Sequence, residues 1–550
     1  MEYLWLSPTI TPITRESIVT QTMVNRREFI LGSLAAIEAG LVPLRAELTK
    51  WMPVLNKLIP ETPASSPNYW CTWATQNYIY GQRAKEPDVR LLEGDAGAKL
   101  ARGAINEELL LGDNGWARVF YPSIRKDLYL LLDDGWEEGG PATFTLDRDR
   151  FPSFAGTPQV RLRGLNDAIC RMGWRGLALW CRHTPRNEEC DHLVAWSKEA
   201  GVHYWKIDGG DLSFNVERTR NVQHASLTLE HVHVEPPLNG DWRLDGRFGN
   251  QPWGSSRMEI VRHADVYRTY DTTALLSIPT TLDRVSELLQ AASGHQEIQA
   301  ILNAEDEVYI AAVLGCTMGV MRNPLNGRRG GKDVDLFFSG PRCLKKCIDE
   351  VARAIRWQRI AAPYAASDGF VRLDEETLTD DWVFNSGETW FIPAIGKRAN
   401  QGAPARISRN LELPEVSCSG RKPFVFTARF PNGAAAIGAH GRMSIHGGWQ
   451  VPKPDVRWKL NNSPGPFAIF GYFSSVTLVF GQPIGKTQIL AQDLVADKAY
   501  DITGLVKNRG SEVVIPQEII ERLGLEGSSP GDQSAPGLLV QFKAIEEITK

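Results

Sequence analysis

Short apolar runs alternating with helix-like stretches constrain the fold of this chain more than any other feature. From Tyr69 to about Met321 this alternation is typical of a parallel sheet or barrel whose strands are joined by helices. The candidate strand cores are Trp70–Trp73, Tyr129–Leu132, Gly176–Trp180, Tyr204–Ile207, Leu227–Val234, Asp265–Tyr270, Ala300–Leu302 and Met318–Met321. These segments are as many as a (β/α)8 TIM barrel requires, so we predict that fold.

Two of these strands end in carboxylates. One runs into Lys206-Ile207-Asp208 and stops at two glycines, and another runs into Asp133-Asp134-Gly135-Trp136. Side chains two apart on a strand share a face, so Lys206 and Asp208 are expected to lie side by side. The C-terminal edge of a parallel barrel is where active sites form. A single acidic strand end is more often a helix cap, but two of them with tryptophans nearby favour a sugar-binding site.

These motifs resemble the retaining α-galactosidase superfamily, glycoside hydrolase families 27 and 36. There the two segments read Asp-Asp-Cys-Trp and Tyr-Leu-Lys-Tyr-Asp. Three further segments follow in the same order as in the family. Pro67–Trp73 is similar to the Gly-Trp-Asn-Ser-Trp segment of the first barrel strand, Phe151–Trp180 to the third βα unit, and Asn303–Met321 to the last βα steps. The resemblance covers roughly residues 65–325.

The resemblance implies a catalytic barrel followed by a C-terminal antiparallel β-sandwich. It implies a retaining glycoside hydrolase that cleaves terminal α-galactosides or closely related sugars by double displacement, without cofactor or metal. Asp208 matches the nucleophile, and Asp133 and Asp134 match the pair that binds two sugar hydroxyls. Lys206 matches a lysine that donates to a sugar hydroxyl and keeps the nucleophile ionised. Retention requires a second carboxyl group about 5–5.5 Å from the first.

Asp271, at the end of the sixth strand candidate, is our choice for the acid/base. In family 27 an arginine precedes this residue by four positions, whereas Arg268 precedes Asp271 by three. The Trp-x-Ser-Asp-x-Thr pattern of family 36 is closer to the sequence that begins at Tyr270. Asp265 and Glu235 are the competing carboxyls, and a helix N-cap is the structural alternative for Asp271.

Further substrate contacts are expected from aromatic and charged side chains. The chain has 17 tryptophans, and tryptophan offers flat apolar faces on which sugar rings stack, although many must be core residues. The stacking candidates are Trp73, Trp136, Trp180 and Trp205. Trp205 alternates with Lys206 along its strand, so a position facing the helices is its alternative. Arg268 and Glu235 complete the predicted binding residues.

The fifth strand candidate leaves the exact sugar open. The motif by which the family selects the group at the second sugar carbon is not recognisable there. α-N-Acetylgalactosaminidase, β-L-arabinopyranosidase and α-glucosidase activities therefore stay as alternatives, as does a transglycosylase with the same residues. His231, His233 and Glu235 alternate onto one face and could form a metal site. Because retaining hydrolysis needs no metal, we predict none.

A different class of protein also fits the pattern. A non-catalytic carbohydrate-binding protein would keep the tryptophan faces and the acidic pair. It would not need two carboxyl groups at catalytic separation.

At 550 residues the chain is too long for one ordinary domain. We predict a leader over 1–59, the barrel over 60–365 and the sandwich over 366–550. The last part contains short β-type runs at Trp390–Ala394, Phe424–Phe430, Ala468–Phe473 and Val476–Phe480. Residues 326–331 are expected to form a loop, Arg342–Gln358 a helix, and Ser511–Leu525 a strand followed by a short helix.

The leader carries two adjacent arginines, Arg26 and Arg27, before a weakly apolar stretch that ends near Leu44. This pattern predicts a twin-arginine signal and export to the periplasm or the extracellular space, with an ordinary amphipathic helix as the alternative. The stretch is too short to span a membrane.

Charge and cysteine content limit the partners. A net charge of −4 gives no polybasic surface, so we predict neither nucleic acid nor membrane as a partner of the mature protein. The expected partner is an oligosaccharide or glycoside, and the oligomeric state stays open. The eight cysteines include no Cys-x-x-Cys pair, which argues against zinc. Gly135 and Gly209 stand where the family has cysteines, so the family's disulfides there are not expected.

Overall fold

The computed structural model divides the chain into two compact units, residues 1–52 and 53–550. Its described residues are 52–54, 57–76, 101–140, 143–182, 187–208, 228–232, 261–269, 276–322, 324, 327–329, 332–334, 342, 347–385, 396–461 and 465–545. The twin-arginine segment, Glu235 and Asp271 lie outside these residues. All the described residues except Met52 belong to the second unit.

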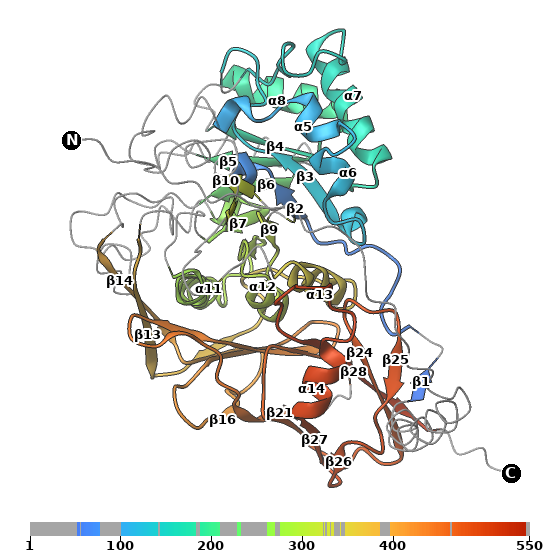
Figure 1. Ribbon diagram of the computed structural model, residues 1–550, viewed down its shortest axis with the longest axis vertical. Helices are drawn as coiled ribbons and strands as arrows, with labels where there is room; N and C mark the ends of the chain where they lie inside the picture. The colour runs from blue at the N-terminus through green and yellow to red at the C-terminus, as the bar shows by residue number, and fades with distance from the viewer. Residues whose placement is uncertain are drawn as a thin grey trace, which may run out of the picture. The chain divides into compact units, whose positions relative to one another are not determined.

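Eight parallel strands form one sheet in the order β8-β7-β6-β5-β4-β3-β2-β9 (Figure 1). The strands are β2 (Asn68–Cys71), β3 (Leu128–Leu132), β4 (Gly176–Arg182), β5 (Tyr204–Asp208), β6 (Thr228–Val232), β7 (Val266–Arg268), β8 (Ile301–Asn303) and β9 (Gly319–Val320). Each predicted strand segment overlaps one of them, with bounds that differ by no more than two residues. The two edges of the sheet also meet, because Asn303 and Thr317 form a parallel bridge and Ala304 N donates to Thr317 O at 3.1 Å. The α/β assignment with a barrel-like parallel sheet is confirmed.

Helices lie between several of these strands along the chain. They are α2 (Trp73–Thr75), α5 (Glu107–Leu111), α6 (Trp116–Val119), the 3-10 helix η3 (Arg125–Asp127), α7 (Pro158–Arg171), α8 (Asn187–Ala200), α11 (Ser277–Ala292) and α12 (Val308–Leu314). Helices α13 (Asp349–Gln358) and α14 (Gln517–Gly524) follow the last strand of the sheet. Helix α7 begins with a side-chain cap, because the Thr157 hydroxyl accepts a hydrogen bond from Val160 N, and Pro158 opens the first turn. None of the helices that the structure describes is long and apolar enough to cross a bilayer.

Side chains alternate between the inside and the outside of the parallel sheet. Tyr69, Cys71 and Tyr204 belong to an interior apolar cluster, whereas Trp70 and Trp205 pack in the outer core beneath the helices. The interior is tightly filled. A Cβ at Gly319 would lie 2.4 Å from the Tyr69 hydroxyl oxygen, so only glycine lets β9 pass beside this ring.

The C-terminal part is rich in β-structure. Together with the N-terminal strand β1 it forms a nine-stranded sheet in the order β1-β25-β24-β28-β22-β18-β17-β15-β12, and it forms a five-stranded sheet in the order β16-β21-β23-β27-β26. Three two-stranded sheets, β10-β11, β13-β14 and β19-β20, accompany them. The strands are β1 (Met52–Val54), β10 (Gly327–Arg329), β11 (Lys332–Val334), β12 (Val371–Leu373), β13 (Thr377–Val383), β14 (Arg398–Pro404), β15 (Arg406–Arg409), β16 (Glu415–Ser417), β17 (Phe424–Arg429), β18 (Ala435–His440), β19 (Arg442–Ser444), β20 (Gly448–Gln450), β21 (Asp455–Asn461), β22 (Phe467–Phe470), β23 (Ser475–Phe480), β24 (Thr487–Asp493), β25 (Ala499–Asp501), β26 (Lys507–Asn508), β27 (Glu512–Pro516) and β28 (Gly537–Ala544).

The two larger sheets are mixed, so the expectation of purely antiparallel sheets is wrong. Pairs β15–β17, β18–β22 and β21–β23 are parallel. The reason lies in the path of the chain, which places β21 in the five-stranded sheet, β22 in the nine-stranded sheet and β23 in the five-stranded sheet again. A strand that returns to its sheet after such an excursion can run parallel to its neighbour, whereas a tight hairpin forces an antiparallel pair.

Several local predictions in this part are confirmed. Strands β17, β22 and β23 fall on predicted runs, and β27 followed by α14 matches the predicted strand and helix. The predicted run Trp390–Ala394 lies outside the described residues. The loop expected at 326–331 is wrong in part, because Gly327–Arg329 pairs with Lys332–Val334 as an antiparallel hairpin.

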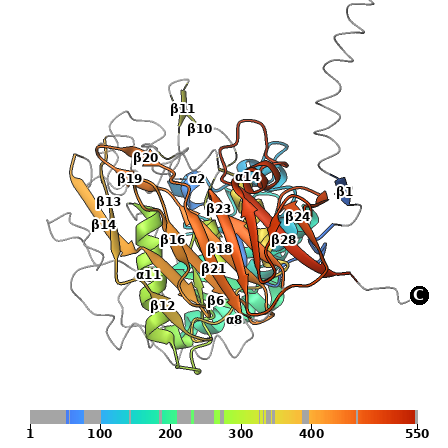
Figure 2. The ribbon, with the colours of Figure 1, turned by 90° about the horizontal axis from the view of Figure 1, so that it is seen from below.

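Helices α11, α12 and α13 lie between the parallel sheet and the C-terminal strands (Figure 1), and Figure 2 shows the C-terminal strands from below. Arg353 of α13 makes a bidentate ion pair with Asp493 of β24, with both N–O distances 2.9 Å and both side chains fully buried. The Tyr309 ring of α12 lies 4.7 Å from the Phe470 ring of β22, measured between centroids. The barrel-like sheet and the C-terminal strands are thus packed within one compact unit.

Candidate active site

Three carboxylates gather at the C-terminal ends of neighbouring strands. Asp133 and Asp134 follow β3 directly, and Asp208 is the last residue of β5, with β4 hydrogen-bonded between them. Register places Lys206 beside Trp180 and Asp208 beside Arg182. The two acidic strand ends that the sequence singles out therefore occupy the same edge of one sheet.

Asp133 is the most enclosed of these groups, with 3% of its surface exposed. Its Oδ2 atom accepts from Lys206 Nζ at 2.7 Å and from Cys71 Sγ at 3.1 Å, and its Oδ1 atom accepts from Asp134 N at 2.9 Å. Burial is the largest single effect on the pKa of Lys206 and lowers it, but the charge of Asp133, with smaller contributions from Cys71 and Asp208, raises the net pKa above the usual value. The described contacts therefore pair Lys206 with Asp133 rather than with Asp208.

Asp134 lies closer to solvent and has a different environment. Its Oδ2 atom accepts from Arg102 Nε at 2.9 Å, and 15% of its side chain is exposed. The pKa of this carboxyl is raised by burial, against the lowering effect of Arg102, and the charges of Asp133 and Asp208 raise it further. The influence of Asp208 agrees with the strand order, which places the acidic pair and the β5 carboxylate at one edge of the sheet.

Glycine follows Asp134 for a steric reason. Gly135 has φ of +120°, and a Cβ there would lie 2.7 Å from the backbone Cα and O of Arg102. A side chain at this position, such as the cysteine of the resembling family, would push away the segment that supplies Arg102.

Asp208 is held by an indole. Trp180 Nε1 donates to Asp208 Oδ2 at 3.2 Å, and Trp180 belongs to the interior apolar cluster. The carboxylate itself is partly exposed. The indole N–H thus restricts the orientation of this carboxylate, and a carboxylate held at a partly exposed strand end suits a nucleophile or a hydroxyl acceptor.

Arg268 at the end of β7 pairs with Glu305, which lies just beyond β8. Its Nε and Nη2 atoms donate to the two carboxylate oxygens at 3.0 and 2.7 Å, and both side chains are almost wholly buried. The partner of Arg268 was not predicted. Glu305 lies two residues beyond β8, and this position after a strand was the only sequence signal for it.

Two expectations about the site need correction. Trp136 has no exposed face for a sugar, because it packs in the outer core against Trp205 and donates from Nε1 to the Trp180 carbonyl at 2.9 Å. Asp265 precedes β7 and so lies at the opposite, N-terminal end of the strands, which removes it as an acid/base candidate. Trp73, in contrast, is partly exposed and packs on the interior cluster. Asp271 and Glu235 fall outside the described residues.

The C-terminal part reaches the interior of the parallel sheet. Phe384 and Met443 belong to the same apolar cluster as Trp180, and Trp449 packs against it. The Arg342 guanidinium lies 5.5 Å from the Trp449 ring centroid and is paired with Glu307. Sequence reasoning missed these residues because their positions depend on long-range packing.

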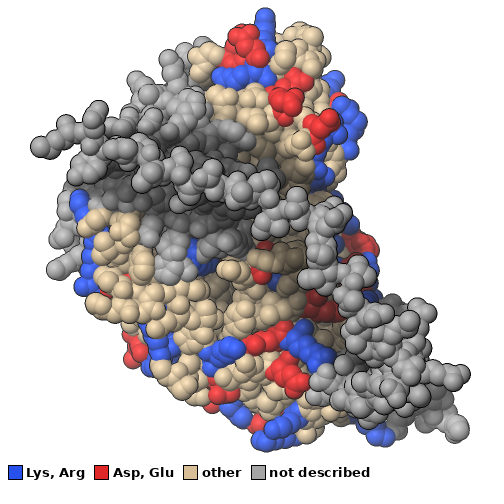
Figure 3. All heavy atoms as spheres, in the orientation of Figure 1, with Lys and Arg blue, Asp and Glu red and all other residues tan. Residues whose placement is uncertain are grey.

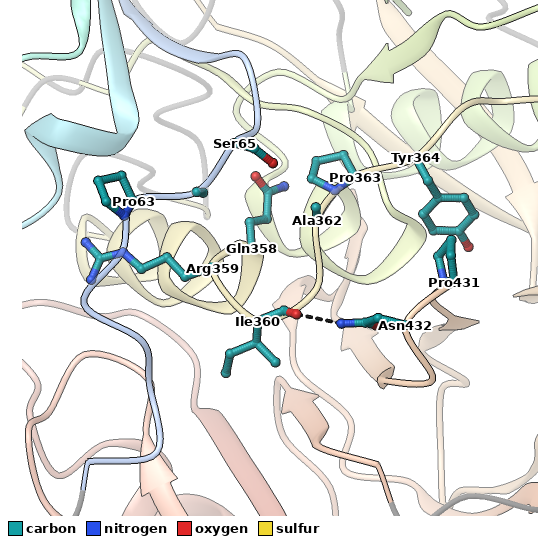
Figure 4. A pocket seen from close by; sticks show the side chains of 11 residues that line it. Pro63, Ser65, Gln358, Arg359, Ile360, Ala362, Pro363, Tyr364, Pro431 and Asn432 are labelled. Atoms are coloured by element: carbon teal, nitrogen blue, oxygen red, sulfur yellow. Dashed lines mark hydrogen bonds between the residues drawn. The ribbon is translucent and has the colours of Figure 1, made fainter.

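The cavity in Figure 4, of about 430 Å³, lies elsewhere. Its lining includes Ser65, before the first residue of β2, and Arg359, after α13. Its polar groups already have partners, because Arg359 pairs with Asp127 and Asn432 Nδ2 donates to the Ile360 carbonyl at 2.7 Å. Because Ser65 precedes β2, this cavity lies at the opposite end of the sheet from the carboxylates, and the Arg359 and Asn432 side chains in its lining are already engaged.

The described residues contain no grouped metal ligands, and the face drawn in Figure 3 carries charges of both signs. Within the ranges that the structure describes, no three His, Cys, Asp or Glu side chains are grouped to hold a metal ion. On the face drawn in Figure 3, the basic and acidic side chains of the described residues are interspersed.

The fold and the site define an α/β protein with an acidic cluster at the strand ends of a barrel-like sheet. No protein-family model matches the chain, and neither does any curated protein. Solved structures do match. One is a putative copper homeostasis protein CutC from Streptococcus agalactiae, at 12% identity and a TM-score of 0.23 over 37% of this chain and 93% of that one.

Two other matches are an octameric ribulose-1,5-bisphosphate carboxylase/oxygenase from Pyrococcus horikoshii and the carboxyl transferase domain of Rhizobium etli pyruvate carboxylase. The first has 11% identity and a TM-score of 0.26 over 44% of this chain and 55% of that one. The second has 15% identity and a TM-score of 0.24 over 47% and 43%. At these scores the likenesses carry no argument about function.

Proposed function

We propose that this protein is a retaining glycoside hydrolase acting on terminal α-galactosides or closely related sugars. The observation that carries the proposal is the grouping of Asp133, Asp134 and Asp208 at one edge of a parallel sheet, with a tryptophan hydrogen-bonded to Asp208. The proposal includes the full (β/α)8 barrel and a C-terminal β-sandwich built from the two larger sheets.

In the proposed reaction, a carboxylate oxygen of Asp208 attacks the anomeric carbon and forms a glycosyl ester. Asp271 protonates the departing glycosidic oxygen and then takes a proton from the water that hydrolyses the ester. The role of Asp271 rests on its sequence position at the end of a strand candidate. The Trp180 N–H group fixes the orientation of Asp208, and orientation of this kind brings the reacting atoms into an attack geometry.

Asp133 and Asp134 are the proposed acceptors for sugar hydroxyls. Adjacent carboxylates repel each other, and here Lys206, Cys71 and Arg102 supply the donors that let both persist. A polyol adds further donors, so binding of a sugar lowers the repulsion that remains. Trp73 and Trp180 are the proposed stacking partners for the sugar ring.

The export signal belongs to the same proposal. An enzyme for external oligosaccharides would reach them through the twin-arginine leader, whose two arginines precede the apolar stretch. The mature protein would act in the periplasm or outside the cell.

The test is hydrolysis of aryl glycosides that differ in sugar and anomeric configuration, with the configuration of the first-formed product followed by NMR. We expect the α-galactoside or a close stereochemical relative to be cleaved with retention. Cleavage with inversion would contradict double displacement. Binding of sugars without any cleavage would favour the carbohydrate-binding alternative, and transfer to an added sugar in preference to water would indicate a transglycosylase.

A further inference from the structure

Cys71 lies against the carboxylate that the structure encloses most completely. It is the last residue of β2, is fully buried, and stands beside Leu131 of β3 in register. Its Sγ atom is 3.1 Å from Asp133 Oδ2. The contact joins the first strand of the sheet to the acidic pair after the second.

The chemistry of the two groups sets the direction of this hydrogen bond. Burial raises the pKa of the Cys71 thiol well above its usual value, and the charge of Asp133 raises it further, so the sulfur keeps its proton. An ionised carboxylate has only acceptor sites. The Cys71 S–H group therefore donates to Asp133.

The donors around Asp133 leave little of its capacity unused. Oδ2 accepts hydrogen bonds from Lys206 Nζ and Cys71 Sγ, and Oδ1 accepts one from Asp134 N. A carboxylate has about four lone-pair sites, so three described donors leave one, on Oδ1. Two donors on Oδ2 and one on Oδ1 fix the plane of the carboxylate, and this plane decides where the remaining site points.

The backbone of the pair is fixed from the same segment. Asp133 N donates to Thr72 Oγ1 at 2.9 Å, and Thr72 Oγ1 donates to Gln76 Oε1 at 2.6 Å. Gln76 Nε2 in turn donates to the Asp134 carbonyl at 2.8 Å. The end of β2 thus holds the main chain of the acidic pair, and Cys71 is the residue of this segment that reaches a carboxylate.

We propose that Cys71 is a positioning residue, whose thiol holds the Asp133 carboxylate so that its free Oδ1 site faces a hydroxyl of the bound sugar. This role rests on the proposed function, because it assumes that Asp133 binds substrate. The rival explanation is that the Cys71 side chain only fills space in the interior of the sheet.

Three substitutions separate the two explanations. Cys71→Ala removes both the donor and the volume, Cys71→Val keeps volume without a donor, and Cys71→Ser keeps a donor with less volume. If positioning matters, Ala and Val each raise KM by about 3- to 10-fold with kcat nearly unchanged, as expected for the loss of one hydrogen bond, and Ser restores much of the loss. If Cys71 only fills space, Val is the variant that restores KM, and the proposal is overturned.

Cys316 provides the matched control. It is equally buried, and its thiol has no side-chain partner among the described contacts. Cys316→Ala removes the same atoms away from the acidic pair and is expected to leave KM unchanged. An equal rise in KM for both alanine variants would indicate general loosening and overturn the proposal.

Infrared spectroscopy tests the hydrogen bond without any substrate. The difference spectrum of wild type minus Cys71→Ala isolates one S–H stretching band, and wild type minus Cys316→Ala isolates a buried reference band. We expect the Cys71 band at lower frequency than the reference, moving toward it in Asp133→Asn. Coincident bands would overturn the proposal. A wild type inactive on every glycoside would instead overturn the proposed function, and the infrared shift would still decide whether Cys71 holds Asp133.

Discussion

Lys206 and Asp133 form the ion pair on which the site depends most. The two charged atoms are 2.7 Å apart, and the side chains are 2% and 4% exposed. Removing both charges from water costs free energy, which offsets much of their attraction. The ion pair therefore fixes the positions of the two side chains more than it adds to the free energy of unfolding. Removing one partner leaves the other as an uncompensated buried charge.

We therefore expect Lys206→Met to lower the free energy of unfolding by about 3–5 kcal/mol. The double variant Lys206→Met/Asp133→Asn should recover part of that loss, because the remaining amide carries no charge. Urea denaturation followed by tryptophan fluorescence measures both values. Equal stability of Lys206→Met and wild type would contradict the prediction that Lys206 compensates a buried charge.

At the same scale, the sequence predicts which residues lie at the strand ends better than it predicts what each of them does. The identity and order of Asp133, Asp134 and Asp208 at strand ends follow from apolar runs that stop at carboxylates. The burial of Trp136 and the partners Cys71 and Arg102 do not, because they depend on which face of each strand turns inward and on segments distant in sequence. The sequence alone does not distinguish a tryptophan that packs in the core behind an acidic pair from one that is exposed in the site.

At the scale of elements, His440 at the end of β18 connects the C-terminal sheet to α12. Its ring stacks at 5.4 Å from Phe426 and 6.4 Å from Tyr309, and its Nε2 atom is 3.9 Å from Glu307 Oε2. Burial lowers the pKa of His440 from 6.5 to about 4, against the raising effect of Glu307, with Arg342 also lowering it.

This pKa predicts how stability depends on pH. Folded His440 stays neutral while the unfolded chain takes up a proton below about pH 6.5, so stability is lost as the pH falls from 6.5 toward 4. Relative to His440→Phe, wild type should lose roughly 3 kcal/mol across this window, as expected from the size of the shift. Denaturation curves at successive pH values measure the difference. A difference independent of pH would mean that His440 titrates alike in both states.

Element positions were the most predictable part of the fold. Each of the eight predicted segments overlaps a strand of the parallel sheet, because a buried strand is a short apolar run between breakers. Strand direction in the C-terminal part was less predictable. The parallel pair β21–β23 arises because β22 lies in the other sheet, and no local pattern shows that excursion.

For the molecule as a whole, the parallel sheet depends on the C-terminal strands. Phe384 and Met443 enter its interior cluster, and Arg353 is paired with Asp493 in β24. The second unit is accordingly compact from Pro53 to Lys550. A fragment that ends near residue 365 would expose this apolar surface and leave Arg353 without its carboxylate.

We expect the fragment 53–365 not to fold cooperatively, whereas 53–550 should unfold in a cooperative transition. Near-UV circular dichroism and thermal unfolding of both chains measure this. Native-like dichroism and a sharp transition for the shorter fragment would show that the C-terminal strands are an accessory to an independent barrel.

Azide rescue of Asp208→Ala on an activated aryl α-galactoside is the decisive measurement for the proposed double displacement. If Asp208 is the nucleophile, the substitution abolishes hydrolysis, and azide restores turnover by forming a glycosyl azide of β configuration. Asp134→Ala is the matched control, since it removes a neighbouring carboxylate that azide should not replace at the anomeric carbon. Full activity of Asp208→Ala, or loss of activity that azide does not restore, would contradict the assignment of Asp208 as nucleophile.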